Sequence, residues 1–207
     1  MGIDSVRLDG RMAVAAGVVG LGSLASLTAL FVVGQPFGTI NDVGNGTLGV
    51  LSGVLAATTL SRQRDSVLET TTVASAIVGA AFAVAGSALV ISGTTGFFLA
   101  SLVSSAGFAL IGAWLVAVNR SVGADRWPRT LRALGVTAGV TMLFGLVMVP
   151  GIAMQLDEMS TAPGWIWIGF VGWIGTFVLY PVWGLWVGRR ALAGARTPAV
   201  AELASSG

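Results

Sequence analysis

The amino-acid sequence predicts an all-α membrane protein, a bundle of six transmembrane helices with both termini in the cytoplasm. Composition is the first observation: 55% of the 207 residues are hydrophobic and only 10% are charged. A soluble domain carries about 25% charged residues. The second observation is a series of apolar stretches, and the third is the placement of the arginines. We therefore expect lipid, rather than water, to surround most of this chain.

Six apolar stretches are long enough, or nearly so, to cross a bilayer, which takes about 20 apolar residues. The predicted spans are 12–33, 43–60, 71–92, 97–118, 131–154 and 165–187. The second is the shortest and the most polar. Together they predict one transmembrane domain over residues 1–190, followed by a disordered cytoplasmic tail at 191–207 that is rich in Ala, Ser, Gly and Thr.

Arginine placement predicts the orientation, because cytoplasmic loops carry an excess of basic residues. All eleven basic residues are arginines, and they flank the predicted spans: Arg7, Arg11, Arg62, Arg64, Arg120, Arg126, Arg129, Arg132, Arg189, Arg190 and Arg196. The other three loops hold only Asp42, Asp157 and Glu158 as charges. The arginines fall on one side only if there are six crossings in this register. We therefore expect a multi-pass protein of the plasma membrane.

Tryptophans lie where interfacial residues are expected. Trp165 and Trp167 open the last span, and Trp183 and Trp186 close it just before the final arginine pair. An aromatic belt at both membrane surfaces is typical of transmembrane helices.

Several catalytic chemistries lack their residues in this sequence. There is no Cys, His or Lys, so thiolate, imidazole and Schiff-base chemistry have no side chain to carry them. The apolar middle of each span lacks ionisable residues, which usually mark proton and ion paths. We expect neither an enzyme nor a bound cofactor or metal. The one-sided arginines argue against nucleic acid as the partner of this basic chain.

Small residues recur at four-residue spacing along the predicted helices, as in Gly49 and Gly53, Ser75 and Gly79, and Gly135 and Gly139. Such stripes let helix backbones approach closely in lipid. Packing within one bundle is the favoured interpretation. The alternative is a face for a homo-oligomer or for a membrane partner subunit.

The first outer loop, residues 34–47, carries most of the polar groups outside the cytoplasmic side. Its Gln35, Asn41, Asp42 and Asn45 are candidate ligand contacts. A simpler interpretation, which we favour, is that Asn41 or Asp42 caps the second helix and that a carboxylate suits the positive end of its dipole. The two interpretations are compatible, since helix N-termini attract polar ligands.

The last span carries Trp173, Phe177 and Tyr180 on one face, at intervals of four and three residues. Pro181 removes a backbone hydrogen bond and should kink the helix. These features are compatible with a cavity wall beside a hinge, with Trp173 and Tyr180 as ligand contacts. An aromatic packing stripe is the favoured interpretation.

Three segments together carry a resemblance: Gly172-Trp173-Ile174-Gly175, the run Tyr180–Trp186 and the loop Asn41-Asp42-Val43-Gly44-Asn45. In these the chain resembles bacterial multi-span integral membrane proteins of unassigned function. The resemblance implies no activity and assigns no functional residues.

Two functions are compatible with the sequence. The first is a small-molecule binding or transport component with an outward-facing site for a weakly polar or amphiphilic molecule. The alternative is a non-catalytic membrane scaffold or partner subunit of a larger complex. The first hypothesis requires that Asn41, Asn45 and Trp173 border a common cavity.

Overall fold

A computed structural model describes residues 3–60, 67–123 and 127–194, and within them all regular structure is helical. Four long α-helices come first: α1 (Ile3–Val33), α2 (Phe37–Leu60), α3 (Val67–Ile91) and α4 (Phe97–Ser121). The fifth rod consists of α5 (Arg129–Leu143), the 3-10 helix η1 (Phe144–Met148) and α6 (Val149–Ala153). The expectation of an all-α fold is confirmed.

The sixth rod changes helix type along its length. It begins as the 3-10 helix η3 (Gly164–Phe170) and continues through α7 (Val171–Ile174), the π-helix η4 (Gly175–Leu179) and α8 (Tyr180–Gly194). A short 3-10 helix, η2 (Met159–Thr161), lies in the connection from the fifth rod. In the π-helical turn the N–H of Tyr180 donates to the carbonyl of Gly175, five residues back, directly before Pro181.

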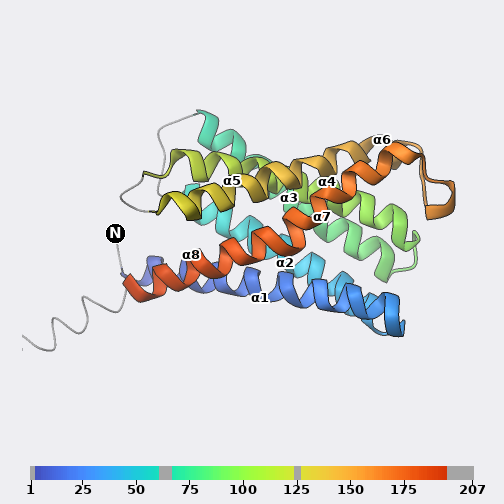
Figure 1. Ribbon diagram of the computed structural model, residues 1–207, viewed down its shortest axis with the longest axis horizontal. Helices are drawn as coiled ribbons and strands as arrows, with labels where there is room; N and C mark the ends of the chain where they lie inside the picture. Colours follow the sequence, from blue (N-terminus) through green and yellow to red (C-terminus); the bar gives the residue numbers. More distant parts are fainter. Residues whose placement is uncertain (1–2, 61–66, 124–126, 195–207) are drawn as a thin grey trace, which may run out of the picture.

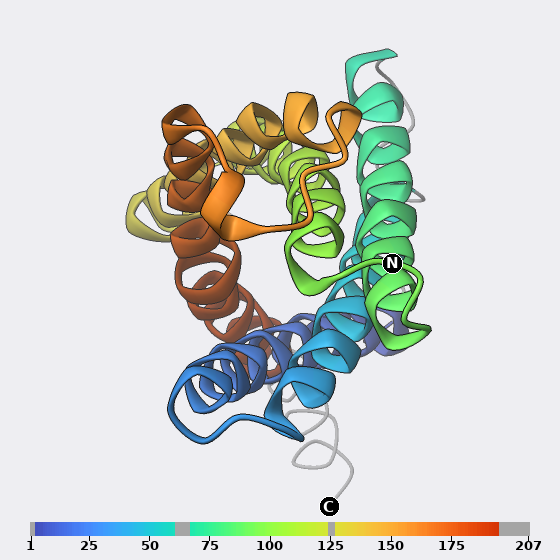
Figure 2. The same ribbon diagram turned by 90° about the vertical axis from the view of Figure 1, so that its right-hand side faces the viewer.

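The six rods close into a ring. Each rod packs against the next in the chain, and α8 returns to pack along α1 (Figures 1 and 2). Helix α4 is the most enclosed, and most of its residues are buried. This arrangement leaves α1, α2, α4, α5 and the last rod with faces that point into one shared interior.

Five helical segments are long and apolar enough to cross a membrane: Val6–Val33, Val67–Ile91, Phe97–Ser121, Arg129–Ala153 and Gly164–Gly194. Helix α2 is not among these five. With 24 residues it is about 36 Å long, which suffices to span hydrocarbon. Its polar first half, rather than its length, sets it apart from the other five.

Several helices extend beyond the spans predicted for them. Helix α1 starts nine residues before the predicted 12–33, and α8 continues to Gly194. The prediction of disorder was therefore wrong for residues 191–194, and the remainder of that tail, 195–207, lies outside the described residues. The physical reason is that apolar stretches mark only the part of a helix that can lie in lipid, whereas the helix itself continues into its charged flanks.

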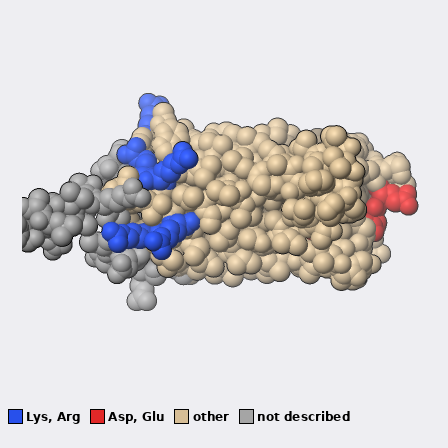
Figure 3. Space-filling view, turned by 90° about the horizontal axis from the view of Figure 1, so that it is seen from below, with Lys and Arg blue, Asp and Glu red and all other residues tan. Residues whose placement is uncertain are grey.

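Charge separates between the two ends of the ring. The described arginines lie near the starts of α1 and α5, at the end of α4 and in the second half of α8, whereas Asp157 and Glu158 lie in the connection before η3, at the opposite end (Figure 3). Trp165 and Trp167 are exposed near the acidic end, as an interfacial position requires. Trp183 is not interfacial as predicted: it is 1% exposed and lies in the core, because its helix face turns toward α4 rather than toward lipid.

Asp157 caps helix α4 from the connection between α6 and η3. Its carboxylate accepts hydrogen bonds from the backbone N–H of Gly96 at 2.7 Å and of Leu99 at 3.2 Å. These N–H groups have no partner within the helix, and a negative charge suits the helix N-terminus. The contact ties two connections that are 61 residues apart in the sequence.

Close contacts between glycines set the spacing around α4. A β-carbon added to Gly112 would lie 2.8 Å from the carbonyl oxygen of Gly139, and one added to Gly139 would lie 2.6 Å from that of Gly112. Gly79 and Gly107 make the same reciprocal contact between α3 and α4. The small-residue stripes at these positions therefore serve packing within the bundle.

We expect Gly139→Ala to lower the free energy of unfolding by about 1–3 kcal/mol, the usual cost of overpacking, because the added methyl group meets backbone rather than a flexible side chain. Thermal unfolding of the purified protein in detergent measures this. Gly22→Ala is the matched control, since nothing lies within 4 Å of its added carbon. Equal melting of the two variants would contradict the close contact.

Candidate functional site

Most polar residues of the predicted first outer loop, Gln35 excepted, lie on a helix. Helix α2 begins at Phe37, so only residues 34–36 connect it to α1. Asn41 and Asp42 are inside the helix and not at its start, and the prediction that either residue caps it was wrong. The cap was predicted because Asn, Asp and Gly favour helix caps and turns in water. In the structure, neighbouring helices enclose Asn41 and Asp42, and only 1% and 8% of their surfaces are exposed.

A pocket lies inside the ring, between α2, α4 and the last rod. Helix α2 contributes Asn41 and Asn45 to its lining, and α4 contributes one face from Phe97 to Phe108. The rest of the lining comes from α1, α5, η1, α7 and η4: Leu27, Met142, Gly145, Gly172, Trp173, Thr176 and Phe177. The space between these side chains is about 400 Å³, including a part that is open to the outside.

The structure brings together three of the six predicted site residues. Asn41, Asn45 and Trp173 all border this pocket. Gln35 is exposed in the turn before α2, Asp42 is buried outside the lining, and Tyr180 is buried in the core next to it. The geometric requirement that Asn41, Asn45 and Trp173 share one cavity is therefore met, while their binding of a ligand stays a prediction.

Two amide oxygens at the pocket have no hydrogen-bond partner. The Oδ1 atoms of Asn41 and Asn45 are both buried and unpaired, and so is the Oγ of Ser23 on the adjacent face of α1. An unsatisfied buried polar group costs about 1–3 kcal/mol. Such groups in a native structure usually face water or a ligand. Asn41 and Asn45 both belong to the lining of the pocket.

A row of hydroxyl groups on α4 faces the same space. Ser101, Ser104 and Ser105 line the pocket, and with Phe108 they follow the spacing of one helix face. Ser101 donates its proton to the carbonyl of Phe97 at 2.7 Å. Ser105 accepts the indole N–H of Trp173 at 3.0 Å. This hydrogen bond supplies the partner that a deeply placed indole requires.

Aromatic rings form the apolar part of the lining. Trp173 and Phe177 meet edge to face with centroids 6.0 Å apart, and Phe177 meets Phe108 of α4 at 6.5 Å. Edge-to-face pairs of this kind stabilise a fixed arrangement of rings. The aromatic face of the last span therefore fits both interpretations of its sequence. Trp173 and Phe177 pack on neighbouring rings and also border the pocket, whereas Tyr180 packs in the core and does not border it.

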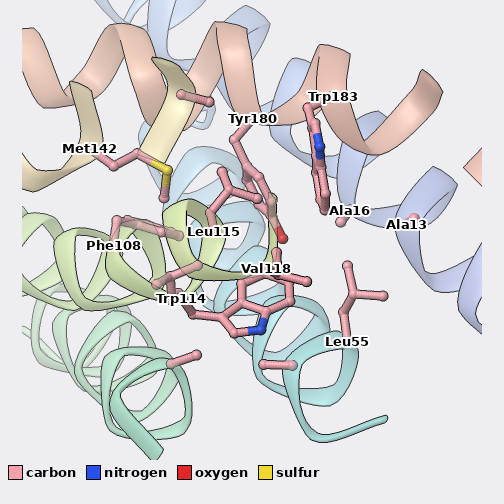
Figure 4. Close-up of a cluster of buried hydrophobic side chains, with 14 of the residues drawn as sticks. Ala13, Ala16, Leu55, Phe108, Trp114, Leu115, Val118, Met142, Tyr180 and Trp183 are labelled. Carbon is pink, nitrogen blue, oxygen red and sulfur yellow. The ribbon is translucent and has the colours of Figure 1, made fainter. Parts of the chain in front are cut away.

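A buried cluster that contains several aromatic rings lies farther along the same helices, between the pocket and the arginines in the order of residues on α4 and on the last rod. Part of this cluster is drawn in Figure 4. Tyr180 stacks on Trp183 with centroids 5.8 Å apart, and Trp183 meets Trp114 edge to face at 6.3 Å. The indole N–H of Trp183 donates to Oδ1 of Asn119 at 3.0 Å, and Asn119 donates to the carbonyl of Leu115 at 2.8 Å. We call the four residues Trp114, Asn119, Tyr180 and Trp183 the plug.

Tyr180 is also tied across the ring to α2. Its hydroxyl lies 2.9 Å from Oγ of Ser52, and Ser52 donates to the carbonyl of Leu48 at 2.7 Å. Because Ser52 has one proton and uses it on Leu48, the tyrosine hydroxyl is the donor in the pair. Ser52 is fully buried and Tyr180 is 1% exposed, so neither hydroxyl has water as a substitute.

Sequence reasoning missed the serine row of α4 and Thr176. The signal was present, because serines at positions 101, 104 and 105 repeat at helical spacing within an otherwise apolar span. Serine also serves close helix packing in lipid, so this spacing alone does not distinguish a packing face from a pocket lining.

Comparisons with protein-family models, curated proteins and solved structures gave no match for this chain.

We expect Ser52→Ala to lower the free energy of unfolding by about 1–3 kcal/mol, because it leaves the buried Tyr180 hydroxyl without an acceptor. Tyr180→Phe should cost less, since the Ser52 proton remains bonded to Leu48. The double variant should be less destabilised than the sum of the two single variants. Thermal unfolding of the four proteins in detergent provides the cycle, and additive losses would show that the two hydroxyls do not interact.

Proposed function

We propose that the protein is a small-molecule binding or transport component that takes a weakly polar or amphiphilic molecule in the pocket between α2, α4 and the last rod. One observation carries the proposal: the amide oxygen of Asn41, a residue that is 1% exposed, is unpaired at a pocket of which it forms part. A bundle that only needed to pack would be more stable with an apolar residue there.

The composition of the lining supports an amphiphilic ligand. Two amides and three serine hydroxyls share the lining with the rings of Phe108, Trp173 and Phe177. Ligand sites in proteins commonly combine a mainly apolar wall with a few placed polar groups. A molecule with one polar head and an apolar body would satisfy both parts of this lining.

The proposed orientation places the pocket on the outer side of the plasma membrane, with both termini in the cytoplasm. The pocket begins at Phe97, the first residue of α4, at the end of the ring opposite to the arginines. Basic residues favour the cytoplasmic side. The plug separates the pocket from the arginine end, so a transport role would require that layer to open.

The alternative role is a scaffold or partner subunit that acts through its surface. In that role the pocket would hold water beside the amides of Asn41 and Asn45. The two roles differ in whether a small molecule stabilises the purified protein.

We expect at least one member of a panel of phenyl- and indole-bearing alcohols, amides, amines and carboxylates to raise the unfolding temperature of the detergent-purified protein in a saturable way. Binding to the folded state alone stabilises by about 2.7 kcal/mol at a ligand concentration one hundred times Kd. Ser101→Phe fills part of the pocket and should abolish the effect. Thr47→Phe, on the exposed face of α2, should preserve it. If no member shifts the wild type, the partner-subunit role remains.

Because the chain contains no cysteine, single introduced thiols report the orientation directly. In intact cells, a membrane-impermeant maleimide should label Ser160→Cys and spare Ser121→Cys until the membrane is permeabilised. Both positions are exposed and lie at opposite ends of the ring. Labelling of position 121 in intact cells would reverse the proposed orientation.

A further inference from the structure

We propose that the pocket opens sideways into the outer half of the bilayer, and that its ligand is an amphiphile whose hydrocarbon chain enters from the lipid. The entrance is a gap between residues 24–33 of α1 and residues 164–174 of the last rod, which we call the lateral gap. The inference rests on the proposed binding function and orientation, and it specifies the class of ligand and its route.

The seam between α1 and the last rod is closed over only part of its length. Helix α1 packs along α8 and reaches η4, but it makes almost no contact with α7 or η3. On its other side the last rod stays against the fifth rod throughout, from α8 to η3. Figure 1 shows the last rod rising away from α1, so that α7 stands farther from α1 than α8 does. The wall of the ring is therefore open at the level of α7 and η3.

The two rods part beyond Gly20 and Pro181. A β-carbon added to Gly20 would lie 2.5 Å from Cγ of Pro181, and one added to Gly17 would lie 2.7 Å from the carbonyl oxygen of Pro181. Gly184 and Gly188 of α8 come similarly close to α1 nearer the arginine end. Such contacts of small residues hold two helix backbones together. On the other side of Pro181, the described glycines of the last rod contact the fifth rod instead or have nothing within 4 Å.

Side chains of α1 beyond Gly20 are exposed on the face that packs against α8 nearer the arginine end. Continued from Gly17 at helical spacing, this face carries Thr28 and Phe31. Gly17 is buried, whereas Thr28 is exposed and 67% of the Phe31 surface is exposed. A helix packed against this face would bury both side chains, so no helix of the described chain covers the face here.

The last rod turns an exposed side toward the lateral gap as well. Gly172 faces the fifth rod, since a β-carbon added to it would lie 3.1 Å from the backbone nitrogen of Gly145. Successive residues of an α-helix are about 100° apart, so Trp173 follows toward the pocket and Ile174 lies on the side away from the fifth rod. Ile174 is 54% exposed. In a closed seam this side would be buried against α1.

The lining of the pocket reaches the lateral gap from both rods. Leu27, which α1 contributes, lies about two turns beyond Gly20. Gly172 and Trp173 belong to α7, the segment with which α1 makes almost no contact. Part of the space between the lining side chains is open to the outside. We therefore place this opening at the lateral gap.

Apolar side chains flank the lateral gap. Neither residues 21–33 nor residues 164–179 include a charged residue, and the hydroxyl of Thr28 is bonded to a carbonyl of its own helix at 2.9 Å. Trp165 and Trp167, at interfacial positions, lie at the start of the last rod, so α7 lies deeper in the bilayer. A hydrocarbon chain keeps these apolar sides out of water, which is the favoured arrangement. The ligand class is therefore an amphiphile whose head lies among the polar groups of the lining and whose chain extends into the lipid.

Collision measurements with a spin label test which medium reaches the pocket. The chain contains no cysteine, so a label on Ser101→Cys reports from the lining alone. On the full-length protein in lipid nanodiscs, its collisions with molecular oxygen, which concentrates in hydrocarbon, are compared with those with a neutral nickel chelate, which stays in water. Labels on Val18→Cys, exposed on α1, and on Ser160→Cys, exposed in η2, give the lipid and water references. We expect the oxygen-to-nickel ratio at position 101 to match that at position 18.

Dodecyl alcohol, which joins a hydroxyl head to a hydrocarbon chain, tests the ligand class. We expect it to raise the unfolding temperature of the wild type in nanodiscs in a saturable way. Thr28→Trp places a large side chain in the lateral gap and should abolish the shift, each variant being compared with its own ligand-free form. Val18→Trp is the matched control, at an exposed position of α1 before the rods part, and should keep the shift. Ser101→Phe should remove it by filling the pocket.

Nickel collisions at position 101 that are as frequent as at position 160 would overturn the inference, because the pocket would then open to water. Rare collisions with both agents would overturn it too, since neither medium would reach the pocket. A shift by dodecyl alcohol that is equal in Thr28→Trp and the wild type, or that is lost in Val18→Trp as well, would also contradict the lateral gap as entrance. If dodecyl alcohol has no effect but water-soluble members of the panel stabilise the wild type in a Ser101→Phe-sensitive way, only the inference fails. If neither dodecyl alcohol nor any panel member binds, the proposed function fails with it.

Discussion

Hydrogen bonds inside this ring must be completed by the ring itself, because lipid offers neither donors nor acceptors. That constraint explains most of the polar side chains in the interior. Trp173 bonds Ser105, Trp183 bonds Asn119, and Tyr180 bonds Ser52, each pair joining two different rods. Three of the six rods are thereby fixed in rotation relative to one another. Against this background of completed pairs, the buried side-chain oxygens of Asn41, Asn45 and Ser23 are without a partner.

The helical fold class and the approximate spans could be predicted from the sequence, because a helix needs a minimum length of apolar residues to lie in lipid. The role of residues 34–47 could not be predicted from it. Helix propensities measured in water assign Asn, Asp, Gly and Thr to loops, but a membrane interior penalises free backbone groups so strongly that the segment 37–47 is helical nevertheless. Of the ligand contacts predicted in residues 34–47, Asn41 and Asn45 border the pocket from within α2, whereas Gln35 and Asp42 do not.

Neighbouring rods could not be identified from the sequence either. That Asn41 and Trp173 share a cavity depends on α8 packing along α1 and closing the ring, which no local pattern encodes. The burial of Trp183 illustrates the same point. Its position before Arg189 is typical of an interfacial residue, and only the neighbouring α4 makes it a core residue bonded to Asn119. Local patterns predict what each helix is, whereas the faces that meet are decided by the whole bundle.

The π-helical turn at Gly175–Leu179 lies between two such bonds. A π-helical turn contains one residue more than an α-helical turn of the same advance, and that surplus can travel along a helix by rotating the intervening residues about 100° each. Here Trp173 is bonded to Ser105 on one side of the turn and Tyr180 to Ser52 on the other. The surplus residue is therefore trapped. Moving it toward either end would swing one of these side chains to a different helix face and break its bond, so Thr176 and Phe177 keep a single register toward the pocket for as long as both bonds hold.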